Sequence, residues 1–170
     1  MPSFRPHRAL PGSVRRLLDL EPRDAVLTTV ELTDGRWAVA TRTSLHLVDE
    51  AGDVHHTWSD VDRGSLEAQS RVLTVHWVDG TTSSLPLSSD RNAPRFAQVF
   101  RERVQQSVVH DRQVTLPGGR LVRVALRRGP AGRLFTQVLG DEGVDLDDPA
   151  VASAVDAAED QVREAAGLLR

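Results

Sequence analysis

Two Asp-Gly dipeptides, Asp34-Gly35 and Asp79-Gly80, constrain the fold of this chain more than any other feature. Each lies between two short runs that are rich in apolar and β-branched residues. Asp-Gly favours the tight turns that join antiparallel strands, because glycine adopts positive φ without strain. The sequence therefore predicts antiparallel hairpins at both places.

The same strand pattern continues on either side of these turns. In the clearest strand, Leu73, Val75 and Trp77 alternate with Thr74 and His76, which places the apolar side chains on one face. Seven short strands are predicted, at residues 25–32, 36–41, 44–48, 54–58, 61–67, 71–78 and 81–87. They precede the first long helix pattern in the chain.

That helix is predicted over residues 93–108, capped by Asp90 or Asn92. Its apolar residues recur at helical spacing and form one stripe: Phe96, Val99, Phe100, Val104 and Val108. A stripe of this kind covers a sheet in most α+β proteins, and the preceding strands are the obvious partner. A shorter helix over 14–20, capped by Ser13 and ended by Pro22, is also expected.

The last third of the chain repeats the order of strands followed by a helix. Strands are predicted at 112–116, 120–127 and 133–139, then an acidic loop over 141–148 and a helix over 149–169. We therefore expect an arm with a short helix at 1–19, a β-domain at 20–108, and an extension at 109–170 that packs on it.

Three short segments resemble the bacterial PH-like domains, which include the YokE-like and GRAM-like modules. These segments are Leu20–Leu27, Val39–Val48 and His56–Val61, in the order and spacing of that family. The two-part layout also resembles a set of proteins from high-GC bacteria. The resemblance covers about half of the chain and ends near Val109.

The resemblance implies an α+β fold, with a PH-like antiparallel β-barrel or sandwich capped by helix 93–108. A three-strand-plus-helix extension follows it. It carries over no catalytic residue, because the matching motifs form strands and corners. PH-like folds serve lipid binding, peptide binding and scaffolding, so the fold alone does not give a function.

The amino-acid composition excludes several kinds of functional site. The chain has 170 residues, a net charge of −3 and no cysteine, which excludes thiol catalysis, disulfides and cysteine-based metal sites. All 21 basic residues are arginine, which fits a GC-rich genome. No apolar run suits a signal peptide or a membrane span, so a cytoplasmic protein is expected.

The spacing of the histidines and acidic residues does not match a known metal-binding pattern. His55 and His56 are adjacent, so on a strand they point to opposite faces and cannot share one ion. His46 and His76 are expected on the polar faces of their strands, as possible cross-strand neighbours but more simply as outward residues. The acids of 141–148 do not match a calcium loop. We therefore predict no metal site and no cofactor.

No catalytic motif is present: there is no nucleophile elbow, phosphate-binding loop or metalloprotease helix. An enzyme is not predicted.

Arginines are concentrated between residues 112 and 140, where there is no acidic residue. Period two places Arg123 and Arg127 together on one face of their strand, giving a cationic outer face. The candidate anion or partner surface consists of Arg120, Arg123, Arg127, Arg128 and Arg133. No aromatic residues alternate with them, as a nucleic-acid stacking platform requires.

The function predicted from sequence is a non-catalytic intracellular binding or scaffolding module. Its partner is expected to be another protein or a second copy of itself. The alternative is binding of an anion, a nucleic acid or a lipid headgroup through the arginine-rich hairpin 112–133.

Overall fold

The computed structural model describes residues 10–140 and 144–168. They divide into two compact units, with the boundary between Gln105 and Gln106, near the boundary expected after residue 108. The fold is α+β, with three antiparallel sheets and a C-terminal helix. The expectation that the extension packs on the first unit stays a prediction.

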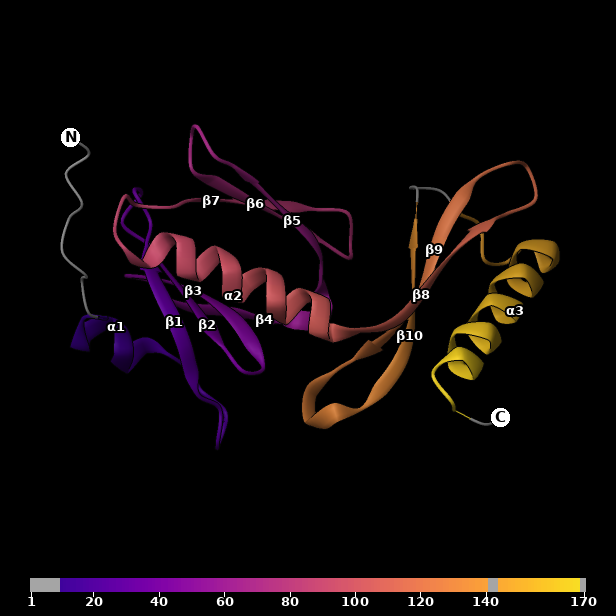
Figure 1. Cartoon of the computed structure of the whole chain (residues 1–170), viewed down its shortest axis with the longest axis horizontal. Coiled ribbons are helices and arrows are strands. Elements are labelled where there is room, and N and C mark those ends of the chain that lie inside the picture. The colour runs from indigo at the N-terminus through magenta and orange to yellow at the C-terminus, as the bar shows by residue number, and fades with distance from the viewer. Residues whose placement is uncertain (1–9, 141–143, 169–170) are drawn as a thin grey trace. The chain divides into compact units, whose positions relative to one another are not determined.

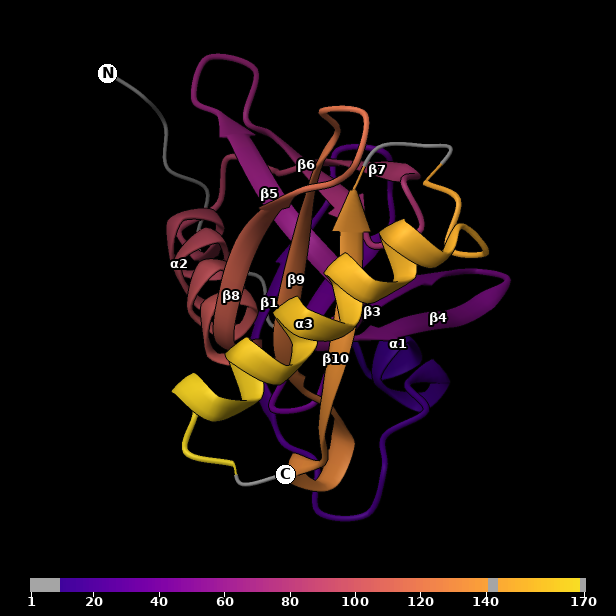
Figure 2. The same cartoon turned by 90° about the vertical axis from the view of Figure 1, so that its right-hand side faces the viewer.

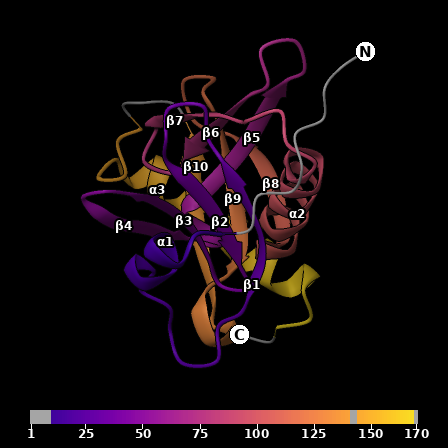
Figure 3. The same ribbon diagram turned by 90° about the vertical axis from the view of Figure 1, so that its left-hand side faces the viewer.

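The first sheet is a four-stranded meander, shown with α1 beside it in Figure 3. It consists of β1 (Val26–Glu31), β2 (Trp37–Thr41), β3 (Ser44–Asp49) and β4 (Gly52–Thr57). The predicted turn between β1 and β2 is present, and its glycine has a φ of 91°. A positive φ of this kind is the conformation for which glycine is favoured.

The second sheet contains β5 (Val61–Glu67), β6 (Val72–Trp77) and β7 (Thr82–Pro86), with β5 at one edge. The predicted Asp-Gly turn joins β6 to β7, and Gly80 has a φ of 86°. A short 3₁₀ turn, η1 (Trp58–Asp60), links the two sheets.

Helix α2 (Asn92–Ser107) runs along both sheets (Figure 1). The carboxylate of Asp90 accepts hydrogen bonds from the backbone N–H groups of Asn92 and Ala93, as the predicted cap requires. The core combines residues of both sheets and the helix; among its largest members are Leu32, Leu45, Trp58, Trp77, Leu85, Phe96 and Phe100.

In the described part of the first unit, the strands do not close into a barrel, so the barrel alternative is wrong. Its strands form two separate sheets, and the bridge between Leu32 and Leu87 links them. The turn η1 interrupts the chain between β4 and β5, so these strands do not continue as one ladder. The two sheets instead share a core with α2.

The second unit is a three-stranded sheet covered by a helix. It contains β8 (Val108–Thr115), β9 (Leu121–Arg128), β10 (Leu134–Gly140) and α3 (Pro149–Ala165), with β9 in the centre. Figure 2 shows α3 crossing one face of this sheet. The buried contact surface consists of Val122, Val124 and Leu126 from β9 and Val151, Val155, Ala158 and Val162 from α3.

Several boundaries differ from the prediction, most clearly those of α1 and β8. Helix α1 (Gly12–Leu17) begins before Ser13, and Pro11 at its N-cap gives no side-chain cap hydrogen bond. It ends well before Pro22, because Leu18 is already extended. Strand β8 begins at Val108, directly after α2, whereas the sequence suggested residue 112.

Candidate functional site

The β3–β4 hairpin brings His46, Asp53 and His55 together. His46 pairs with His55 across the two strands, and Val48 pairs with Asp53. Directly paired residues project from the same face, as do residues two apart on one strand. The hairpin register therefore places both imidazoles and the carboxylate on one face of the sheet.

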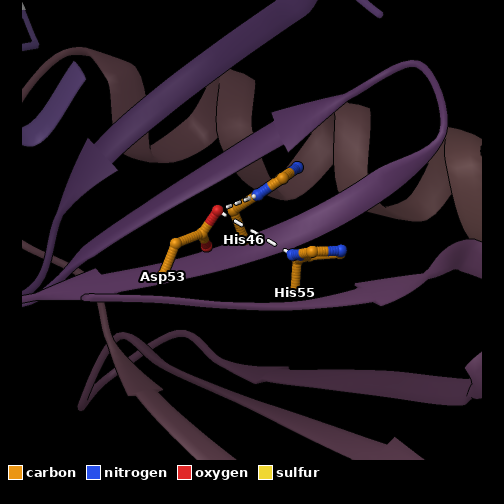
Figure 4. Close-up of side chains that lie close together, drawn as sticks. All are labelled: His46, Asp53 and His55. Carbon is orange, nitrogen blue, oxygen red and sulfur yellow. Dashed lines mark hydrogen bonds and ion pairs between the residues drawn. The ribbon is translucent and has the colours of Figure 1, made fainter. Parts of the chain in front are cut away.

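The three side chains converge on one carboxylate oxygen (Figure 4). The Oδ2 atom of Asp53 lies 2.7 Å from Nδ1 of His46 and 3.9 Å from Nδ1 of His55. The two imidazole rings have centroids 4.9 Å apart and planes tilted by 31°. Nitrogen and oxygen ligands at such spacing are the components of a divalent metal site.

Burial differs across the cluster. The side chains of His46 and Asp53 are each 2% exposed, whereas that of His55 is 39% exposed. Helix α1 lies against β3, and the backbone N–H of Asp19 donates to Oδ2 of Asp53 at 2.9 Å. The segment that follows α1 thus covers the face that the sequence assigned to solvent.

Two buried polar atoms of the cluster lack hydrogen-bond partners among the described residues. They are Nε2 of His46 and Oδ1 of Asp53. A buried polar group without a partner costs about 1–3 kcal/mol.

The histidine predictions are in part wrong. His46 is buried rather than outward, and it cannot neighbour His76, because β3 and β6 belong to different sheets. His55 and His56 do point to opposite faces, since His56 packs on Trp77 with ring centroids 4.2 Å apart. The sequence placed strands at 44–48 and 54–58, but it did not reveal the register that pairs His46 with His55.

The predicted arginine surface is dispersed. Arg127 is buried at 0% exposure, and Arg123 lies 3.7 Å from the carboxylate of Asp111. Arg120 is exposed before β9, whereas Arg128 and Arg133 are exposed at its other end, flanking the β9–β10 turn. Eight residues of extended chain separate these ends by about 25 Å. The five arginines do not form one continuous exposed surface.

The last residue of the acidic loop caps the helix that follows it. The carboxylate of Asp148 accepts the N–H of Ala150 at 2.8 Å and caps α3. Residues 141–143 lie outside the described part of the chain.

A groove of about 830 Å³ lies between β5 and α2, within the first unit. Gly64, Leu66, Leu73 and Phe100 contribute to its apolar floor, and charged and amide residues line the rim. Strand β5 is the edge of its sheet, and residues 63–67 are exposed. The groove thus combines apolar surface with the edge of a β-sheet.

Comparison of the chain with protein-family models, with curated proteins and with solved structures gives no match. The resemblance to PH-like domains therefore remains a prediction. Among the described residues, no helix has the length and apolar character needed to cross a membrane.

Proposed function

We propose that this protein is a non-catalytic intracellular binding module with a PH-like first unit. Its ligand is an extended segment of another protein, bound in the groove between β5 and α2. The observation that supports this proposal is the position of an edge strand beside an apolar groove.

The edge of β5 supplies the backbone part of the interaction. An edge strand presents a row of N–H and C=O groups, and an extended peptide can add to the sheet through them. The exposed stretch Arg63–Glu67 contains no proline, which would interrupt such pairing. Strand addition here needs no rearrangement of β6 or β7.

The groove supplies the side-chain part. Leu66 is 47% exposed and pairs with buried Leu73 on β6, and buried Phe100 lines the same groove. Alternate side chains of a bound strand point toward one face, so every second residue of the ligand faces this floor. The rim carries both charge signs, including Arg63, Arg101 and Glu102. We therefore expect apolar side chains, rather than net charge, to determine affinity.

Two matched leucine variants test this assignment. A peptide is first selected from a random displayed library for binding to the full chain, and its affinity is then measured by calorimetry. Leu66→Arg is expected to weaken binding at least tenfold, whereas Leu121→Arg leaves it unchanged. Leu121 is an apt control, because it is a leucine of similar exposure (56%) on the second unit. Equal affinities for the two variants would contradict the proposal.

The same variants also test whether the chain binds a second copy of itself. If the wild-type chain forms a dimer in solution and Leu66→Arg converts it to a monomer, the groove holds a second copy of the chain. Mass measurement by light scattering distinguishes the two occupants.

The alternative is an anion site at the β9–β10 turn, favoured by the exposed pair Arg128 and Arg133. Phosphate-containing ligands lose affinity steeply as salt rises, because binding releases counterions. A single-stranded oligonucleotide that binds at low salt, and is lost in the Arg128→Ala, Arg133→Ala double variant, would favour this function over peptide binding.

A further inference from the structure

The cluster of His46, Asp53 and His55 has features that protein binding in the β5–α2 groove does not explain. Each side chain offers one ligand atom, and these atoms all lie within 4.8 Å of one another. All three residues belong to one hairpin, β3–β4, on the opposite side of the sheet from the Leu45 side chain that enters the core. The cluster is thus separate from the groove.

We propose that His46, Asp53 and His55 form a binding site for a divalent transition-metal ion, with Zn²⁺ as the best match. Two imidazole nitrogens and one carboxylate oxygen are borderline and hard donors that suit Zn²⁺ and its neighbours, whereas Ca²⁺ and Mg²⁺ prefer oxygen alone. Three protein ligands leave one position of a tetrahedral zinc ion for water.

The geometry meets this requirement with a small adjustment. Zinc lies about 2.0–2.2 Å from nitrogen and oxygen ligands, so two ligand atoms of one tetrahedral ion are about 3.3–3.6 Å apart. The contact from Asp53 Oδ2 to Nδ1 of His46, 2.7 Å, is a hydrogen bond that has to open for the ion, and the contact to Nδ1 of His55, 3.9 Å, has to close. The ligand atoms of the three residues all lie within 4.8 Å of one another. His55 is the most exposed member, so its ring has the most freedom to adjust.

The charge of the cluster favours a cation. Among the described residues, the Asp53 carboxylate lies beside the two imidazoles and accepts a hydrogen bond from the backbone N–H of Asp19. Burying a carboxylate is costly unless its negative charge is compensated. A divalent ion at this position compensates the charge.

The surrounding structure holds the ligands in position. The backbone N–H of Asp19 orients the carboxylate, as groups outside the coordination sphere do in metal sites. Tight pairing of β3 with β4 fixes the backbone of all three residues. Sites built on paired strands are better ordered than sites on loops.

Cobalt provides a direct probe, because Co²⁺ replaces Zn²⁺ and its tetrahedral complexes absorb visible light. The untagged full chain, freed of metal by chelation, is titrated with Co²⁺ and then with Zn²⁺ against a chromophoric chelator. We expect one ion per chain, visible bands on Co²⁺ addition, and loss of those bands when Zn²⁺ is added.

Two histidine variants decide whether the ion lies at this cluster. His55→Ala removes a half-exposed ligand and is expected to weaken Zn²⁺ binding at least about tenfold. His110→Ala removes an exposed histidine of the second unit and is expected to bind as the wild type does. Circular dichroism of both variants checks that they are folded.

Three results would overturn the proposal. They are no stoichiometric binding by the wild type, unchanged affinity in His55→Ala, or an equal loss in His110→Ala. Because Leu66 and the peptide ligand take no part in these measurements, the metal site and the peptide groove succeed or fail separately.

Discussion

Nδ1 of His46 lies 2.7 Å from Oδ2 of Asp53, and both side chains are almost completely buried. Residues seven apart in the sequence meet because the β3–β4 turn folds the chain back on itself. The hydrogen bond stabilises the fold only while Asp53 is present, since Nδ1 of His46 would otherwise be a buried polar atom without this partner.

Removing the carboxylate is therefore expected to destabilise the metal-free protein. Asp53→Ala leaves Nδ1 of His46 and the N–H of Asp19 without this acceptor, at a cost of about 1–3 kcal/mol. Urea unfolding followed by circular dichroism measures the change. Glu50→Ala, an exposed acid in the same hairpin, is the control. Equal midpoints for the two variants would show that the buried pair contributes nothing.

Gly64 is expected to tolerate no side chain, because the ring of Phe100 occupies the space where a Cβ would lie. Gly64→Ala forces the ring or the strand to move, which costs about 1–3 kcal/mol in the free energy of unfolding. The neighbouring exposed Ser65→Ala should have little effect. In a Phe100→Leu background the penalty of Gly64→Ala should shrink, and an undiminished penalty would contradict this packing.

The N-terminus of α3 depends on a single acid. Asp148→Ala removes the hydrogen bond to the N–H of Ala150 and is expected to lower stability by about 1 kcal/mol. Asp147→Ala is a matched control, because it removes the same charge one residue earlier, where the side chain does not cap the helix. Thermal unfolding of both variants measures the difference, and equal losses would mean that charge rather than capping matters.

Asp24 is expected to stabilise the fold in a pH-dependent way. Partial burial raises the pKa of Asp24, but hydrogen bonds from Thr41, Thr43 and two backbone N–H groups outweigh it and hold the pKa below the ordinary 3.8. A lowered pKa in the folded state means that the ionised carboxylate favours folding. This contribution is present above pH 3.8 and is lost as the pH falls through the folded-state value.

Asp24→Asn measures this contribution. At neutral pH the variant should be less stable than the wild type by about 1 kcal/mol. The difference should disappear in acid, because the wild-type carboxyl then becomes protonated. Glu21→Gln removes a nearby exposed charge and serves as the control. A difference that persists unchanged in acid would contradict the assignment.

Local patterns in the sequence predicted the elements well, for physical reasons. The Asp-Gly turns specify hairpins through backbone geometry alone, and the stripe from Phe96 to Val104 has one way to be buried. The cap-and-proline start of α3 at Asp148 is equally local. These features depend on residues a few positions apart, so they can be found without knowing the fold.

The barrel and the burial of His46 depend on contacts between distant segments. Alternation of Leu45 and Leu47 with His46 indicated one buried face of β3, but α1 and Asp19 cover the other face too. No pattern within β3 shows that a preceding helix returns to cover it. The number of strands likewise does not show whether two sheets close, which here depends on the turn at Trp58–Asp60.

The sequence did not reveal the candidate sites, because predicting each one requires knowing how strands pair or which strand lies at the edge of its sheet. His46 and His55 meet only when Asp49 pairs with Gly52, and a slip of one residue would move them apart. The arginine face was predicted from alternation, which gives no information on whether Arg127 is covered. Predicting the groove requires knowing that β5, rather than another strand, lies at the edge of its sheet.

The most direct test of the central claim is a map of the peptide site by nuclear magnetic resonance. The isotopically labelled full chain is titrated with the selected peptide, and amide shifts are followed residue by residue. We predict that the largest changes fall on 62–67 of β5 and on 97–105 of α2, the residues beside the groove. Changes centred on the β9–β10 turn, or spread without preference over both units, would contradict the account.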